Sequence, residues 1–171
     1  MLTGDKIFLR ALEPEDLEFL YRAENDASIW HAGVIQQPLS KFTLAAYLEN
    51  ANQTIDEAGQ LRLVICLLNT NKPIGLIDLF EYDATNQRAG VGVMLLQEQR
   101  GKGLGVDALK VLKAYASEKL RLHQLYCHVQ QENIASVGLF NKSGFVTIGT
   151  LTDWVRTANG YSNVYLMQCI L

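Results

Sequence analysis

The sequence contains few of the residues that build disulfide frameworks and metal sites. Its three cysteines, Cys66, Cys127 and Cys169, are far apart and each lies in an apolar run, so we expect them to be buried strand residues. His123 and His128 are five residues apart on an expected strand and would face opposite sides. This spacing does not suit a zinc site, and we predict no metal.

An excess of one charge and long apolar runs are also missing. The chain has 15 Lys and Arg against 18 Asp and Glu, a net charge of −3, so nucleic acid and anionic membranes are not expected partners and any anion site must be local. No apolar run approaches membrane-spanning length, and the first residues lack a basic segment followed by an apolar one. We therefore expect a cytoplasmic protein. At 171 residues with 49% apolar composition, residues 1–171 are expected to form a single domain.

A basic, glycine-rich loop is the most informative segment present. Residues 99–105 read Gln-Arg-Gly-Lys-Gly-Leu-Gly, follow an apolar run and open an amphipathic helix. Glycines let several backbone N–H groups approach an anion, and the unpaired N–H groups at a helix start attract one. Arg100 and Lys102 add positive charge. The loop therefore predicts a pyrophosphate site.

Spacing separates the candidate ligands of this loop. A nucleoside triphosphate loop needs Lys-Ser or Lys-Thr after its last glycine, but Gly105 is followed by Val106 and Asp107. A dinucleotide loop has G-x-G-x-x-G straight after a strand, whereas this chain has G-x-G-x-G after the polar segment 97–100. A plain turn into a helix rarely combines three glycines with two cations. Both nucleotide interpretations are therefore disfavoured.

Hydrophobic periodicity predicts a mixed sheet with helices on both faces, an α/β (α+β) class of fold. The predicted strands cover residues 6–12, 61–68, 74–80, 87–96, 125–129, 145–151 and 161–171. The predicted helices begin near Pro14, after an N-cap at Ser40 with Gly59 beyond the end, after the glycine loop, and at 133 with its end at Gly144. Residues 24–39 are expected to be a loop.

Two motifs resemble those of the GCN5-related N-acetyltransferases. Arg100-x-x-Gly103-x-Gly105 resembles the acetyl-CoA loop, and residues 133–145 are similar to the family segment N-x-x-S-x-x-x-(Y)-x-K-x-G-F. The order of elements also matches. Residues 9–16 and 75–79 resemble the branch that acetylates ribosomal-protein N-termini and polyamines. The resemblance implies the acyl-CoA N-acyltransferase (GNAT) fold, with a mostly antiparallel sheet of about seven strands, and makes a homodimer plausible.

The resemblance also implies a reaction, a cosubstrate and the residues that hold it. The reaction is acetyl transfer from acetyl-CoA to a primary amine of a small molecule or a protein N-terminus. Pantetheine is expected along the backbone at the end of the strand before the loop, with the short helix facing it. The implied acetyl-CoA residues are Met94, Leu95, Leu96, Arg100, Gly101, Lys102, Gly103, Leu104, Gly105, Asn133, Ser136 and Phe140.

An amine must lose a proton before it attacks, so the site needs a base or a desolvating pocket. Two positions depart from the family pattern. Phe140 stands where many relatives have a proton-donating tyrosine, and Gly90 where some have a glutamate base. These departures keep a CoA-binding sensor or interaction protein with little transferase activity as the alternative function.

Three other residues are candidates for the base. Asp78 is a lone carboxylate in an apolar strand, and its alternative roles are to cap backbone or to pair with a cation. His128 carries an imidazole, which exchanges protons near neutral pH, or is simply an exposed strand residue. Glu132 is the third candidate.

The acceptor site is less clearly indicated. In the family the amine approaches between the first two helices and the last hairpin, so Glu24, Trp30, His31 and Trp154 are candidate wall residues, as is Asp26. Each could equally be surface or packing. The polyamine enzymes carry paired glutamates before a proline here, whereas this chain has Gln36-Gln37-Pro38, which weakens the prediction of a polycationic substrate.

Overall fold

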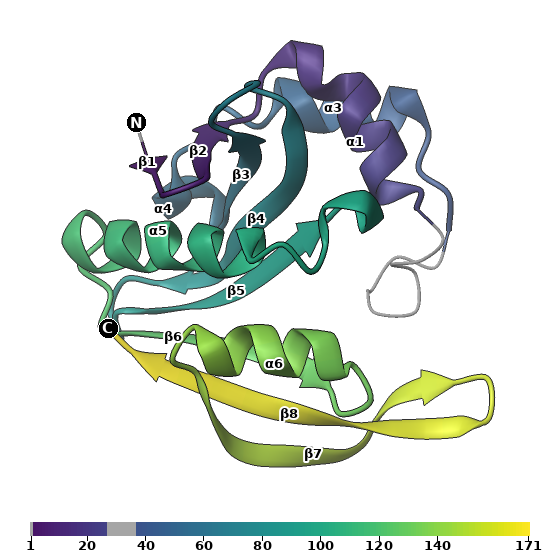
Figure 1. Ribbon diagram of the computed structural model, residues 1–171, viewed down its shortest axis with the longest axis vertical. Coiled ribbons are helices and arrows are strands. Elements are labelled where there is room, and N and C mark those ends of the chain that lie inside the picture. Colours follow the sequence, from purple (N-terminus) through teal and green to yellow (C-terminus); the bar gives the residue numbers. More distant parts are fainter. Residues whose placement is uncertain (1, 27–36) are drawn as a thin grey trace.

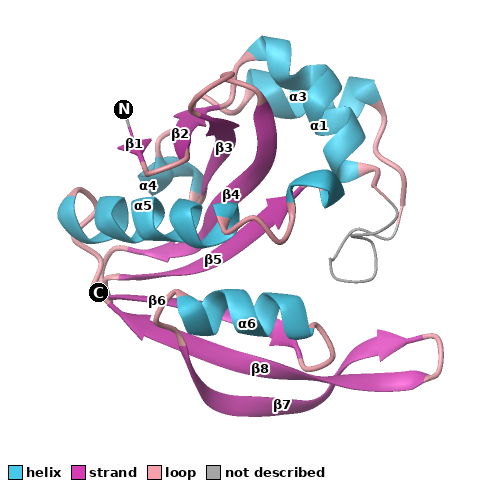
Figure 2. Ribbon diagram, in the orientation of Figure 1, coloured by secondary structure: helices cyan, strands magenta, loops and turns pink. Residues whose placement is uncertain are grey.

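The computed structural model describes residues 2–26 and 37–171, which contain one eight-stranded sheet (Figures 1 and 2). The strand order is β1-β2-β3-β4-β5-β6-β8-β7. The strands are β1 Leu2–Thr3, β2 Ile7–Ala11, β3 Leu61–Leu67, β4 Pro73–Asp83, β5 Arg88–Leu95, β6 Gln124–Gln130, β7 Val146–Thr157 and β8 Gly160–Ile170. The α-helices are α1 Leu17–Glu24, α3 Lys41–Glu49, α4 Ile55–Ala58, α5 Leu104–Glu118 and α6 Ile134–Lys142. Short 3-10 helices cover Pro14–Asp16 and Gln97–Gln99.

Neighbouring strands are antiparallel except β5 and β6, which are parallel and joined by the crossover through α5. Pairing between β5 and β6 is limited to three positions, from Arg88 opposite Gln124 to Gly90 opposite Tyr126. Beyond these positions the two strands separate, and the sheet is split by a V-shaped opening. Apart from the two-residue strand β1, the other neighbouring strands pair at five or more positions, so the opening is confined to this one junction.

The two faces of the sheet bury different helices because strand side chains alternate between faces. One face carries Ile77, Val91 and Cys127 into a core shared with α5 and α6. The other carries Val64 and Leu76 into a smaller core beneath α1 and α3. Figure 1 shows α5 and α6 side by side on the first face. The V-shaped opening therefore connects a face covered by α5 and α6 with a face that α1 and α3 cover only in part.

Asp107 fixes the start of α5 against the N-terminal strands. Its buried carboxylate accepts hydrogen bonds from the backbone N–H groups of Lys6 at 2.7 Å, Asp5 at 3.0 Å and Ile7 at 3.2 Å. Gly4 closes the same turn, where a Cβ would lie 2.5 Å from Asp107 Oδ1. The first turn of α5 is thus anchored to the turn between β1 and β2.

The predicted class of fold is confirmed, with one additional strand. β1 has two residues, too few for a periodic pattern. Ser40 is the N-cap of α3, since its hydroxyl accepts the Thr43 N–H at 3.1 Å. Gly59 does not follow α3 as predicted. It ends α4, a single turn that the sequence analysis did not predict.

The three cysteines are buried and free, as expected. Among the described residues, no helix is both long enough and apolar enough to cross a membrane.

Candidate active site

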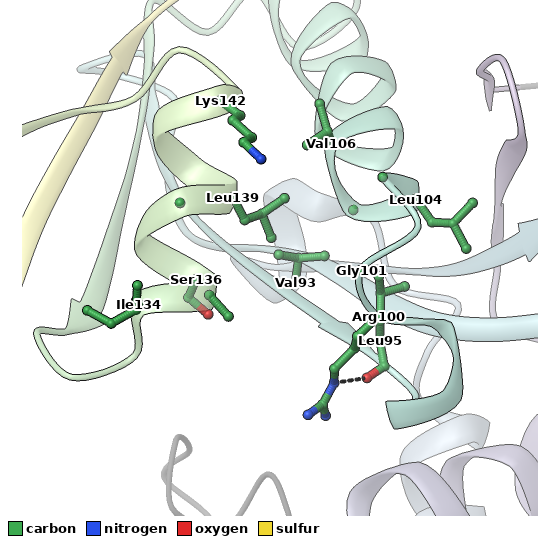
Figure 3. A pocket seen from close by; sticks show the side chains of 14 residues that line it. Val93, Leu95, Arg100, Gly101, Leu104, Val106, Ile134, Ser136, Leu139 and Lys142 are labelled. Atoms are coloured by element: carbon green, nitrogen blue, oxygen red, sulfur yellow. Dashed lines mark hydrogen bonds between the residues drawn. The ribbon is translucent and has the colours of Figure 1, made fainter.

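A cavity of about 450 Å³ lies between the glycine-rich loop, the start of α5 and one side of α6 (Figure 3). Of the residues predicted to hold acetyl-CoA, its lining includes Leu95, Arg100, Gly101, Gly103, Leu104, Gly105 and Ser136. Its other lining residues are Val93, Val106, Ile134, Ala135, Gly138, Leu139 and Lys142. The loop and the short helix, about thirty residues apart in the sequence, therefore face the same cavity.

The three loop glycines have two different physical roles. Gly101 and Gly103 have φ of 74° and 78°, the left-handed region that residues with a Cβ rarely adopt. Gly103 is the N-cap of α5, and its carbonyl accepts the Asp107 N–H at 3.2 Å, so the preceding N–H groups project from the helix start. Gly105 instead permits close packing, because a Cβ there would lie 3.1 Å from Leu139 Cδ1.

Two cations border this cavity. Arg100 is anchored by a 2.9 Å hydrogen bond from its Nε to the Leu95 carbonyl, which leaves the outer guanidinium nitrogens at the mouth (Figure 3). Lys142 extends from α6 toward α5 in the same view. Lys102 lies outside the cavity lining, with its Nζ 3.1 Å from Gln99 Oε1. A loop with projecting N–H groups and flanking cations fits the pyrophosphate of acetyl-CoA.

Lys142 was missing from the predicted set although the second motif contains it. A stripe at helical spacing, Ala135, Gly138, Leu139 and Lys142, carries α6 side chains to the cavity. The helical spacing of Lys142 from these residues was the signal in the sequence that could have placed it at the cavity.

Some predicted acetyl-CoA residues have other roles in the structure. Asn133 is the N-cap of α6, and its Oδ1 accepts the Ser136 N–H at 3.1 Å. The ring of Phe140 is buried against Phe145 with centroids 5.1 Å apart and is not among the residues that line the cavity, so its contact with acetyl-CoA stays a prediction. Met94 and Leu96 send their side chains into the core under α1 and α3, which leaves their backbone for a ligand.

Asp78 is held in a charged cluster on the opposite face of the sheet. It lies opposite Gly92 on β5, and its Oδ1 is 2.6 Å from Arg62 Nε. Arg62 Nη1 is also 2.7 Å from Glu24 Oε1, and its guanidinium lies over the Tyr47 ring. Burial raises the pKa of Asp78, and Arg62 offsets this only in part. Asp78 therefore pairs with a cation, and Glu24 is a buried partner of the same arginine.

His128 lies across the opening from Asp78 on the same face. Gly90 on β5 is paired with Tyr126 on β6. His128 is two residues beyond Tyr126, so its side chain points to the same face of the sheet. Its exposed ring makes an edge contact with Tyr126 at 5.9 Å. The Tyr126 hydroxyl donates to Glu81, and burial together with this bond raises the pKa of Tyr126 to about 12. His128 is thus beside a protonated phenol that donates to a carboxylate.

The remaining candidates lie elsewhere. Glu132 accepts a hydrogen bond from the Ser162 hydroxyl, which lowers its pKa and weakens it as a base. Trp154 is 63% exposed on β7, outside both described cavities. Trp30 and His31 lie outside the described residues. Within 2–26 and 37–171, no three His, Cys, Asp or Glu residues gather in a way that could hold a metal ion.

The fold and the cavity define a class of protein that comparison with known families identifies. The sequence profile described as "Acetyltransferase (GNAT) domain" matches residues 6–146. The chain belongs to this family, as its two motifs suggested, and it is an N-acetyltransferase.

Its relatives include enzymes that act on spermidine. The spermidine N(1)-acetyltransferase of Escherichia coli (strain K12) is 29% identical over 171 residues, which cover 99% of this chain and 88% of the relative. The crystal structure of spermidine N-acetyltransferase from Vibrio cholerae in complex with CoA and spermine is 27% identical, with a TM-score of 0.86 over 96% of this chain and 95% of that one. A dodecameric structure of the Vibrio cholerae enzyme is 28% identical, with a TM-score of 0.80 over 96% and 93%.

Proposed function

We propose that this N-acetyltransferase transfers an acetyl group from acetyl-CoA to a primary amine of a small molecule or a protein N-terminus. The observation that carries the proposal is the V-shaped opening between β5 and β6. The glycine-loop cavity borders β5 on one face, and titratable side chains flank the opening on the other. A donor and an acceptor could therefore meet through the sheet from opposite sides.

The residues that would hold acetyl-CoA lie on three elements. The N–H groups at the start of α5 and the guanidinium of Arg100 would bind the pyrophosphate, and Lys142 would add a third source of positive potential from α6. The backbone at Leu95 would bind the pantetheine arm. When bound, acetyl-CoA supplies a thioester, whose carbon–sulfur bond breaks as the amine nitrogen bonds to the acyl carbon.

We assign removal of the ammonium proton to His128. Its ring is exposed on the acceptor face, and imidazole exchanges protons near neutral pH. Asp78 shares Arg62 with Glu24, so we assign this cluster a structural role on the acceptor face. No acid is assigned, because Phe140 has no proton to give and a thiol of pKa about 8–9 leaves as a thiolate without one.

We propose that the acceptor is an amine with little positive charge rather than a polyamine. The relatives act on spermidine, but three carboxylates on this face already have cationic partners. Arg62 lies between Glu24 and Asp78, and Arg88 pairs with Asp83 at 3.2 Å. Such pairing reduces the negative potential available to a highly charged acceptor. By analogy with the dodecameric neighbour, we also propose that the chain self-associates, which light scattering would test.

The test is release of free thiol from acetyl-CoA with a panel of amines and N-terminal peptides, beside a CoA-binding titration. We expect turnover, a loss of kcat of at least tenfold in His128→Gln, and a smaller effect in Asp78→Asn. A base makes the rate rise with pH as it loses its proton. Loss of this rise in His128→Gln would identify His128 as the base. CoA binding without turnover on any acceptor would favour the CoA-binding sensor, and absence of CoA binding would contradict the whole assignment.

A further inference from the structure

A second cavity, of about 740 Å³, lies on the sheet face opposite to α5 and α6. It extends from the start of β5 and β6, where the two strands are still paired, to His128 beside the opening. Tyr126 and His128 line it from β6, and Leu166 and Gln168 from β8. Their neighbours Cys127 and Met167 point into the core under α5, so alternation places these four side chains on the opposite face.

One carboxylate in this groove is held in a strained position. Glu81 has φ of 49°, uncommon for a residue with a Cβ, within a bulge between Phe80 and Asp83. The bulge brings Glu81 to the hydroxyl of Tyr126, which donates a hydrogen bond but carries no positive charge. Asp83, by contrast, is paired with Arg88 at 3.2 Å. Among the described residues, Glu81 is therefore the carboxylate of this groove that has no cationic partner, and Tyr126 contacts both Glu81 and His128.

The other side of the groove is apolar. Ile148, on β7, is 52% exposed, and Leu166 is half-buried beside it. The rings of Tyr126 and His128 continue this surface toward the opening. Aromatic faces and apolar side chains beside one carboxylate suit a cation that carries an apolar body.

We propose that this groove is the acceptor site and that it takes a primary amine with one positive charge and an apolar body of aromatic size, such as an arylalkylamine. The inference rests on the transferase function proposed above. The ammonium group lies near Glu81 and His128, and the body lies against Ile148 and Leu166. A single uncompensated carboxylate balances a monoamine and leaves the further charges of a polyamine without partners.

The test compares kcat/KM for 2-phenylethylamine, 1,4-diaminobutane and spermidine. We expect 2-phenylethylamine to exceed the other two by at least tenfold. Ile148→Ser and Glu81→Gln should each raise its KM about tenfold and leave the KM for acetyl-CoA unchanged. The matched control is Val146→Ser, because Val146 is 60% exposed on the same strand but outside the groove lining. Its KM values should not change.

Several outcomes would overturn the proposal while the transferase function stands. One is a preference for spermidine, and another is an unchanged amine KM in Ile148→Ser and Glu81→Gln. A third is a change of oligomeric state in Ile148→Ser with no change in KM, which would mean that a second copy of the chain covers the groove. If no amine is acetylated, the transferase function fails separately, and calorimetry with 2-phenylethylamine decides on the groove. If 2-phenylethylamine binds and Ile148→Ser weakens this binding, the groove is supported as its site. Absence of binding overturns the proposal.

Discussion

The ring of Phe80 lies against Gly90 so closely that a Cβ built on the glycine would be 2.3 Å from Phe80 Cε2. Gly90 is the position where some relatives carry a glutamate base. The space for a side chain at this position is filled by the Phe80 ring from the neighbouring strand. Any base must therefore come from another position.

This contact predicts coupling between the two positions. Gly90→Ala should lower the free energy of unfolding by about 1–3 kcal/mol, because an overpacked site must move a ring or the backbone. Adding Phe80→Ala should recover part of that loss, so that the double-mutant cycle gives a coupling energy of roughly 0.5–3 kcal/mol. Chemical denaturation of the four proteins measures it. Purely additive effects would show that the ring moves aside at no cost.

Two glycines that border the acetyl-CoA cavity should respond in opposite ways to alanine. Gly103 has φ of 78°, so Gly103→Ala should lower stability by about 1–2 kcal/mol and weaken CoA binding. Gly138 lies inside α6 with nothing within 4 Å of a Cβ, so Gly138→Ala should raise stability by up to about 1 kcal/mol. Thermal unfolding and CoA titration of both variants test this. Equal effects would contradict the role given to the left-handed backbone.

The charge at the cavity mouth should control affinity for CoA. Arg100→Glu and Lys142→Glu should each weaken binding about tenfold, which corresponds to about 1.4 kcal/mol, and the difference from the unchanged protein should shrink at high salt. Arg156→Glu is the control, because Arg156 is exposed on β7 and outside the cavity. Calorimetric titrations at two ionic strengths suffice. A loss equal to that of the control would remove the assignment.

Removing the Asp107 carboxylate should loosen the start of α5. Asp107→Ala leaves three backbone N–H groups without their acceptor, two of them only partly buried, and should cost about 2–4 kcal/mol of stability. Asp107→Asn should cost less, since one amide oxygen can still accept. Hydrogen exchange at Lys6 and Ile7 should quicken in both variants. Unchanged exchange there would mean that the turn holds without the carboxylate.

Stability at acid pH should depend on Asp16. Burial opposes its charge, but hydrogen bonds from Arg10, at 2.6 and 2.8 Å, and from the Glu13 N–H outweigh this and lower its pKa. A lowered pKa in the folded state stabilises the protein above the ordinary value near about 4, and this contribution is lost as pH falls through the folded-state value. Asp16→Asn should therefore cost about 2 kcal/mol at pH 7 and progressively less below pH 4.

Denaturation at several pH values measures that difference. Asp56→Asn serves as the control, because Asp56 is exposed in α4 and its substitution should have a small effect at every pH. A cost for Asp16→Asn that stays constant down to pH 2 would contradict the role of the ionised carboxylate.

The glycine-rich loop that lines the first cavity was predictable because its signal is local. Glycines, flanking cations and the start of a helix follow one another within seven residues, and the residues on either side of the glycines disfavour two nucleotide classes. The same applies to Ser40, whose hydroxyl caps the turn that follows it. Local rules of this kind need no knowledge of strand order.

Long-range partners were not predictable, since they depend on register. That Asp78 pairs with Arg62 follows from two strands aligned residue for residue, and Asp107 meets an N–H group 100 residues away. The packing of Phe140 against Phe145 was not predictable either, because a place in the motif does not reveal which way a ring turns in a packed core. A one-residue shift in any of these registers would reverse the face presented.

The three paired positions between β5 and β6 also give the sheet a mechanical property. They are the backbone pairs that join the half of the sheet ending at β5 to the half beginning at β6, and they lie at one end of the junction. The other connection is the core of side chains under α5 and α6, which spans both halves. We expect the width of the open end to depend on how this core packs, so a substitution there should change the binding of acetyl-CoA without touching it.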